Sequence, residues 1–474
     1  MIEDGVFWLP EYPEITVRGH LTYGTGQAPK VELVDAITPA LRVVSTTTND
    51  DGNVVSELEP ADDVENFTIH GIVRNSPQMI SLIECVTISR RSEMASASFE
   101  DQVLQARYML RGAHISGDDQ LYSAVKVRVA NIDEWVGLPG FSVSTGSTDE
   151  VKLIYRRPKV PSALTEDGAT VRVSESMRRS WPKATGGHIT RECWILVENF
   201  GLRTFHEISR DYVTPVVSIL NLSMGVASPV TATALKVGDD WCSVWHSNIT
   251  EEATSLSRTR NDFLLPLSAL SISSIAKFLD LTGKIGPLAP VVADADSGLR
   301  RATLETQVLE LTTVAEGLHR SLYPEESRFS KDAAIRIQKL VREALQNEPE
   351  PCNSVVQGFF THIEEPNYKT RLRRLVDVAT SLIPGVVGSA DLWVKLVDSA
   401  RNSFAHRTQQ ILSVEKIDEY YAISQSLRWV LVGVLLAESS VDKEDCIPRI
   451  QEFSRYRQYL RNMKSSLPSV FAPD

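Results

Sequence analysis

The chain has 474 residues, of which 42% are hydrophobic and 23% are charged, and its formal net charge is −12. This length suggests two or three domains with a sizeable buried core, and the composition is typical of a soluble globular protein. The negative charge excludes a protein that coats nucleic acid through overall basicity. The excess of acidic residues lies within residues 1–300, so the C-terminal third would repel a polyanion least.

Neither the cysteines nor the apolar segments indicate export or a membrane. The five cysteines are scattered and none forms a CxxC pair, which argues against a disulfide framework and against a zinc knuckle. The first residues lack the basic and apolar regions of a secretory signal. The longest strongly apolar run, Trp429 to Ala437, is far shorter than the ~20 residues of a membrane span. We therefore expect a soluble, cytoplasmic protein with no membrane partner.

Residues 1–255 are predicted to form a β-rich antiparallel domain. Short segments alternate apolar and polar residues, which is the period of half-buried strands, and turn-forming clusters separate them. Their spacing favours a sandwich or a barrel-like sheet. One helix is expected at 213–224, ending at Gly225. The predicted strands are 15–23, 30–37, 66–73, 79–88, 122–132, 150–157 and 169–176.

The rest of the chain is predicted to be helical, which makes the whole an α+β multidomain protein. A mixed connector is expected at 256–300, and an all-α bundle at 301–474. In 301–322 apolar residues recur every three or four positions, as on one face of a long helix. Further helices are predicted at 331–346, 353–364, 367–380, 389–409, 414–438 and 447–464. The N-caps expected for these later helices are Asn353, Asn367, Ser389 and Ser413.

Three residues in the helix predicted at 389–409 carry the functional hypothesis. Asn402 and His406 are four positions apart, so they project from the same face of a helix. The long side chain of Arg401 can reach the same cleft. A guanidinium, an amide and an imidazole would thus lie together at the rim of the bundle.

These groups can cleave RNA without a metal ion or another cofactor. Histidine transfers protons near neutral pH, so His406 is the predicted general acid or base. Arg401 can stabilise negative charge on the phosphoryl oxygens through paired hydrogen bonds, and Asn402 can orient His406 or the phosphate. The reaction needs an acid and a base, whereas one chain offers one such histidine. We therefore expect a composite site at a homodimer interface, and products with 2′,3′-cyclic phosphate ends.

The motif resembles that of a known family. The run Arg401-Asn-Ser-Phe-Ala-His406 fits the Arg-x4–6-His motif of HEPN domains, in the form with a polar residue after the arginine. The helix at 304–324, which contains Glu316, is similar to the first helix of the ApeA-like HEPN group. The N-terminal part resembles the ApeA N-terminal domain. The matching segments are Gly5-Val-Phe-Trp-Leu-Pro, Val17-Arg-Gly-His-Leu-Thr-Tyr, Arg111-Gly-Ala-His114 and Trp135-Val-Gly.

This resemblance implies a prokaryotic anti-phage protein that acts by abortive infection. The helical domain would be an endoribonuclease that cuts RNA, with transfer RNA as one candidate. The β-rich domain would sense a phage-derived trigger, regulate the nuclease or support assembly. An alternative is a non-catalytic HEPN module that dimerises or binds nucleic acid in a defence or toxin–antitoxin system. The intact motif favours the enzyme, because a binding module has no need of these three residues.

Other arrangements resemble catalytic sites less well. Arg107 and His114 also fit the loose motif, but they lie near a predicted strand where no bundle cleft is expected. Cys242 and His246 share one face of a predicted strand, yet no third group is identifiable that would orient the histidine. His319 is interpreted as a bundle residue rather than a metal ligand, because no cysteines or clustered carboxylates accompany it at ligand spacing.

Basic residues of the helical region are candidates for binding RNA phosphates. The predicted contacts are Arg371, Arg374, Arg407, Arg455 and Arg457. The last two belong to a stretch interleaved with Phe453, Tyr456 and Tyr459, aromatic residues of the kind that stack on bases. The competing interpretation of both stretches is a solvated helix face.

Overall fold

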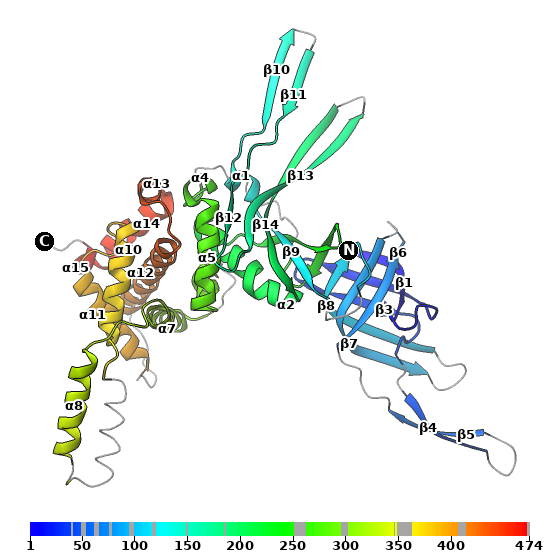
Figure 1. The fold of residues 1–474 in the computed structure, drawn as a ribbon, viewed down its shortest axis with the longest axis horizontal. Coiled ribbons are helices and arrows are strands. Elements are labelled where there is room, and N and C mark those ends of the chain that lie inside the picture. Colours follow the sequence, from blue (N-terminus) through cyan, green and yellow to red (C-terminus); the bar gives the residue numbers. More distant parts are fainter. Residues whose placement is uncertain are drawn as a thin grey trace. The chain divides into compact units, whose positions relative to one another are not determined.

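The computed structural model divides into two compact units (Figure 1). The N-terminal unit comprises Met1–Val217 and Ser228–Arg260, and the helical unit comprises Ser218–Ala227 and Asn261–Asp474. The structure describes the whole chain except residues 39–40, 49–53, 61–65, 75–77, 94–98, 116–119, 148–149, 184–185, 251–261, 295–301, 346, 348–362, 406–413 and 472–474.

Six antiparallel strands close into a barrel in the N-terminal unit. In spatial order they are β8 (Phe99–Arg111), β3 (Gln27–Leu33), β2 (Val17–Gly24), β1 (Ile2–Trp8), β6 (Phe67–Val73) and β7 (Gln78–Glu93). The circle closes because β7 also pairs with β8. Alternate residues of these strands point inward and are buried, as the period of two requires. The barrel core includes Phe7, Leu21, Val31, Ile69, Ile80, Leu82, Leu104 and Met109.

The same sheet continues beyond the barrel. Residues 102–105 of β8 pair with β3 and residues 108–111 pair with β16, so β8 belongs to both the barrel and the extension. The extension consists of β16 (Asp240–His246), β15 (Val230–Val237), β9 (Tyr122–Val129), β14 (Gly186–Arg203), β13 (Thr170–Lys183) and β12 (Ser162–Leu164). Two hairpins form separate sheets, β4 (Leu41–Thr48) with β5 (Val54–Pro60), and β10 (Phe141–Ser147) with β11 (Glu150–Tyr155). The predicted β-rich antiparallel fold is therefore confirmed, and of the two expected forms, a sandwich or a barrel-like sheet, the strands form the barrel.

Short helices connect the strands. They are α1 (Ile132–Val136), α2 (Phe205–Ile208) and the π-helical turn η1 (Ser209–Val213), which leads into α3 (Thr214–Met224). The helix expected at 213–224 is α3, and it ends at Gly225 as predicted. Gly225 has a φ of +69° and its amide bonds to the Asn221 carbonyl at 3.0 Å, which is a glycine C-terminal cap.

The described helical unit is a bundle of antiparallel and crossing helices around α12 (Val414–Glu438), which contacts α7, α10, α11 and α14. The others are α4 (Leu267–Leu270), α5 (Ile272–Ile285), α6 (Leu288–Asp294), α7 (Leu304–Leu322), α8 (Lys331–Ala344), α10 (Tyr368–Leu382), α11 (Ala390–Ala405), α13 (Lys443–Glu452), α14 (Ser454–Ser466) and α15 (Pro468–Phe471). By length and composition α12 could cross a membrane, but most of its apolar stretch is buried within the unit. That burial is typical of a core helix and agrees with the buried helix predicted for Trp429 to Ala437.

The helix starts follow local capping rules where the structure describes them. The Asn367 side chain accepts a hydrogen bond from the Thr370 amide at 3.0 Å, which confirms the predicted N-cap of α10. The Ser389 hydroxyl accepts one from the Leu392 amide at 3.5 Å, at the start of α11. The predicted caps Asn353 and Ser413 lie outside the described residues, as does most of the helix expected at 353–364.

Two expectations about the helical region differ from the structure. The segment 256–300, expected to be a connector, contains α5 and α6, and both helices pack against α7. The prediction of a single helix at 447–464 is wrong, because the helix is interrupted at Phe453, between α13 and α14. Phe453 has φ −62° and ψ 122°, an extended backbone conformation that ends α13. Its side chain is only 5% exposed, so the residue that interrupts the helix also buries its aromatic ring.

Candidate active site

Helix α11 positions two of the three predicted catalytic residues. Its buried side includes Trp393 and Ala400, which are 0% and 3% exposed. Trp393 Nε1 donates a hydrogen bond to Ser426 Oγ of α12 at 2.8 Å, so the rotation of α11 about its own axis is fixed by a buried polar contact. Arg401 and Asn402 follow Ala400 directly and lie at the edge of this buried side.

Arg401 is held by contacts with α7 and α10. Its Nη2 forms an ion pair with Glu316 Oε2 at 2.5 Å, and its Cζ lies 4.3 Å from the centroid of the Tyr368 ring. The side chain of Arg401 is nevertheless 32% exposed, and that of Glu316 is 21% exposed. The guanidinium is therefore oriented by a carboxylate and an aromatic face while part of it remains open to solvent.

Tyr368 presents a neutral ring to this guanidinium. Burial raises the pKa of Tyr368, although the positive charge of Arg401 acts in the opposite direction. Its hydroxyl donates to the Thr312 carbonyl oxygen at 3.3 Å, which fixes the ring. A neutral phenol keeps the negative electrostatic potential of its face, and that potential attracts the cation.

The ion pair at Arg401 continues into a chain of charges. Glu316 also accepts from Arg320 at 3.2 Å, and Arg320 lies 2.9 Å from Glu365, which pairs with Arg371 at 2.7 Å. Positive and negative side chains alternate along this chain, so Glu316 is fixed from two sides. This network connects α7 with α11 and with the segment that precedes α10.

Arg371 belongs to the interior of this network. It is 4% exposed, and its Nε donates to the Pro366 carbonyl oxygen at 2.9 Å while its Nη2 contacts Glu365. A guanidinium that is buried and bonded in this way fixes the start of α10. Its placement does not favour the predicted RNA contact, because a phosphate would have to displace these bonds.

Arg374 of α10 lies in a second, neighbouring group, with partners at the end of α7 and just after it. Its Nε is 3.0 Å from Glu326, its Cζ lies 4.7 Å from the Tyr323 ring centroid, and the side chain is 45% exposed. The same Glu326 lies 3.1 Å from Nε2 of His319, a residue that is 1% exposed. Burial lowers the pKa of His319, against the opposing effect of Glu326. The RNA contact of Arg374 stays a prediction.

The third catalytic candidate, His406, and the predicted RNA contact Arg407 lie outside the described residues. Asn402, in the last described turn of α11, is exposed. The structure thus brings Arg401 and Asn402 to the same helix end, next to the position where His406 follows in sequence. Within the described part of the chain, no group of three or more His, Cys, Asp or Glu side chains is arranged to hold a metal ion.

The remaining basic candidates lie on α14. Arg455 and Arg457 are exposed, so their RNA contacts stay predictions. The aromatic residues between them and beside them are buried, with Phe453, Tyr456 and Tyr459 at 5%, 1% and 5% exposure. These rings pack into the bundle, so the idea that they stack on bases is wrong.

The other catalytic arrangements have structural explanations. Arg107 pairs with Glu84 at 2.6 Å, whereas His114 stacks on the His70 ring with centroids 4.5 Å apart, so the two residues do not form one site. Cys242 is buried, and burial raises its pKa. A thiol in that setting is a poor nucleophile.

The sequence motif does not include the two residues that orient Arg401. Glu316 enters the family resemblance only as part of a helix, and Tyr368 has no part in it. One signal was available, because Glu316 and Arg320 are spaced for an i, i+4 ion pair. The contact between Glu316 and Arg401 spans 85 residues of sequence, and no local pattern predicts it.

Two protein-family models match the chain. The model of ApeA N-terminal domain 1 matches residues 3–278, and the model of the Apea-like HEPN domain matches residues 309–445. The second range includes Glu316, Arg401 and His406. No curated protein and no solved structure is significantly similar to the chain. HEPN domains are usually associated with RNA cleavage, and in this setting they imply a nuclease-like role in defence. The chain therefore belongs to the ApeA family, with an ApeA N-terminal domain followed by an ApeA-like HEPN domain.

Proposed function

We propose that the protein is a metal-independent HEPN endoribonuclease that cleaves RNA in the cytoplasm as part of abortive infection, with transfer RNA as the first substrate to test. The observation that carries the proposal is the setting of Arg401. Its guanidinium is oriented by Glu316 and Tyr368 and yet is about one-third exposed. The exposed part leaves room for a phosphate oxygen to approach, whereas Arg371 is only 4% exposed.

The proposed reaction needs one proton acceptor and one proton donor. A neutral His406 takes the proton of the ribose 2′-hydroxyl, and the 2′-oxygen forms a bond to the adjacent phosphorus. The bond from phosphorus to the 5′-oxygen breaks, and a protonated His406 donates a proton to that oxygen. The products are a 2′,3′-cyclic phosphate and a 5′-hydroxyl end, so atoms and charges balance without a cofactor.

Arg401 supplies the electrostatic part of this reaction. Negative charge on the non-bridging phosphoryl oxygens increases in the transition state, and a guanidinium fixed beforehand stabilises it without further reorganisation. Glu316 and Tyr368 act as positioning residues, because they touch Arg401 rather than the substrate. Asn402 is proposed to orient either the phosphate or the imidazole.

The two histidine roles lead to the proposed assembly. A single chain has one His406, whereas the reaction uses an acid and a base at the same phosphate. A two-fold axis through the HEPN domains would bring two copies of the motif together and supply both. HEPN domains generally dimerise and bind RNA, which supports this arrangement.

The experiment is cleavage of defined RNA by the full chain and by its His406→Ala variant. We expect the variant to lose at least about 100-fold in rate, because general acid–base catalysis contributes about 10²–10⁴-fold. The wild type should leave 2′,3′-cyclic phosphate ends. His188→Ala, which changes an exposed histidine of the N-terminal unit, is the matched control and should cleave normally.

Two results would contradict the proposal. Normal cleavage by His406→Ala would remove the assigned role of the histidine, and loss of cleavage in EDTA would contradict metal independence. If the folded wild type binds RNA but cuts none of the substrates tested, the alternative of a non-catalytic HEPN module replaces the enzyme.

A further inference from the structure

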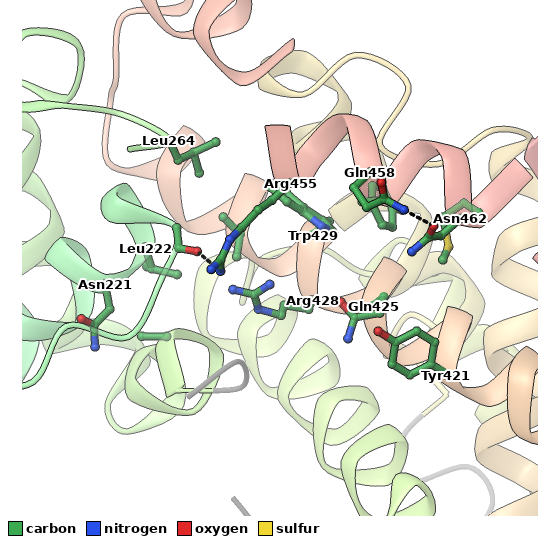
Figure 2. Close-up of a pocket in the computed structure, with 15 residues that line it drawn as sticks. Asn221, Leu222, Leu264, Tyr421, Gln425, Arg428, Trp429, Arg455, Gln458 and Asn462 are labelled. Carbon is green, nitrogen blue, oxygen red and sulfur yellow. Dashed lines mark hydrogen bonds between the residues drawn. The ribbon is translucent and has the colours of Figure 1, made fainter. Parts of the chain in front are cut away.

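A pocket in the helical unit lies outside the Arg401 network. It has a volume of about 210 Å³ and is bounded by the end of α3, by one side of α12 and by α14 (Figure 2). None of its lining residues belongs to the ion-pair chain around Arg401. Its volume is below the ~300–1,000 Å³ of pockets that enclose drug-sized ligands, so a ligand of that size would be enclosed only in part and would extend toward solvent.

The charge of the pocket is one-sided. Arg428 of α12 and Arg455 of α14 both line it, and none of the fifteen lining residues that the structure describes is acidic. A guanidinium has five N–H donors, so each arginine can keep its partners within the protein and still donate to an anion in the pocket. Arginine presents paired donors that match the oxygens of a phosphate or a carboxylate.

The pocket has two chemically different ends. Figure 2 shows the guanidinium groups of Arg428 and Arg455 toward the α3 end, and the side chains of Gln425 and Tyr421 toward the other. Tyr421 is 50% exposed, so its ring is accessible. Asn462 lies at this second end as well, where it accepts a hydrogen bond from Gln458 at 2.7 Å. Amides next to an accessible ring can bind a flat polar group such as a nucleobase.

The charged end is built by tertiary contacts rather than by chance proximity of flexible side chains. Arg455 Nη1 donates to the Gly225 carbonyl oxygen at 3.1 Å, which fixes this exposed arginine across the end of α3. A Cβ at Gly225 would lie 2.8 Å from the Phe453 ring, so glycine allows the wall of the pocket to pack this closely. Phe453 does not line the pocket itself but packs against this glycine.

We propose that this pocket binds a small phosphate ester of mononucleotide type, with the phosphate at Arg428 and Arg455 and the flat polar group at Gln425 and Tyr421. The phosphate oxygens accept hydrogen bonds from the two arginines, and the amides distinguish the ester from inorganic phosphate. This binding does not depend on the proposed nuclease activity, so the two proposals can fail separately.

The test is isothermal titration calorimetry of the full chain with AMP, inorganic phosphate and adenosine. We expect AMP to bind more tightly than either of the other two. Arg455→Gln should weaken AMP binding about 10- to 100-fold, since it removes charge-assisted hydrogen bonds. Lys464→Gln is the matched control, because Lys464 is exposed on the same helix and does not line the pocket. It should change the affinity by less than about 2-fold.

Folding of the variants is checked by thermal unfolding followed by circular dichroism. If Arg455→Gln unfolds early, Arg428→Gln replaces it and should weaken AMP binding to a similar degree. Equal losses in Lys464→Gln and Arg455→Gln would overturn the proposal, as would adenosine binding as tightly as AMP. The proposal would also be overturned if a short RNA binds while AMP does not bind at ~10 mM. The arginines would then contact the phosphates of an RNA strand rather than a small phosphate ester.

Discussion

Glu316 offers the sharpest test of how the fold prepares the candidate active site. The substitution Glu316→Gln removes the negative charge that lies 2.5 Å from Arg401 but keeps a side chain of the same size and one acceptor oxygen. The guanidinium then keeps its contact with Tyr368 and loses its charged partner. We expect a folded protein whose Arg401 spends less time in the catalytic orientation.

The contacts around Glu316 set the size of the effect. Both partners are partly exposed, at 32% and 21%, so solvent screening limits the loss of stability to about 1 kcal/mol. The catalytic loss is larger, because an oriented donor at a developing oxyanion contributes about 10²–10³-fold in kcat. The introduced amide would retain part of this orientation through its acceptor oxygen, and we expect kcat to fall about 10-fold with KM changed less than about 3-fold.

The assay is single-turnover and steady-state cleavage of a fluorescent RNA, with urea unfolding of each variant. Glu305→Gln, in the first turn of the same helix, is the matched control and should keep its kcat. Glu316→Asp restores the charge on a shorter side chain and should recover part of the lost rate. If Glu316→Gln lowers stability but leaves kcat unchanged, Glu316 is only structural and its positioning role is refuted.

Two predictions concern stability. Burial lowers the pKa of His246 from its ordinary value of 6.5, and its Nδ1 accepts a hydrogen bond from the Asn248 amide at 3.3 Å. The folded state therefore favours the neutral ring. The resulting stability is present above about pH 6.5 and is lost as the pH falls through the lowered pKa. Urea unfolding at about pH 7.5 and about pH 5.5 measures this loss, and His246→Gln should reduce the difference between the two; an unchanged difference would contradict the assignment. Gly225→Ala should destabilise the protein by about 2 kcal/mol or more, because alanine is strained at φ +69° and its Cβ would meet the Phe453 ring. An equilibrium urea titration that shows no loss would contradict this reasoning.

The fold class was predictable because each half of the chain has one dominant period. Alternation along segments such as 66–73 and 169–176 predicted strands that the structure contains as β6 and β13. The N-cap at Asn367 and the helix end at Gly225 were also predictable, because each depends on only a few neighbouring residues. Closure of the barrel was not predictable from the sequence. It depends on the pairing of β7 with β8, which also pairs with β3 and β16, and the register between such distant strands has no local signal.

The site was predictable only where its residues are close in sequence. Arg401, Asn402 and His406 lie within six positions, so helical spacing alone groups them. Orientation of Arg401 depends on Glu316 and Tyr368, from other helices, and sequence spacing says nothing about that. The basic stretch on α14 illustrates the same limit. Its aromatic residues looked available for bases, whereas they are the side that packs into the bundle.

A final prediction tests whether two chains share one catalytic centre. If each scissile phosphate needs His406 from both chains, a dimer with one His406→Ala chain has no complete site. When wild type and variant are co-expressed with different tags and the chains pair at random, activity should fall with the square of the wild-type fraction. At equal amounts about a quarter of the activity remains, whereas independent sites would leave about half. Purification through both tags isolates the mixed dimer, which should be inactive under the first scheme. A mixed dimer with half the wild-type rate would mean that each chain carries its own acid and base, and a second proton-transfer group would then have to be sought within the same chain.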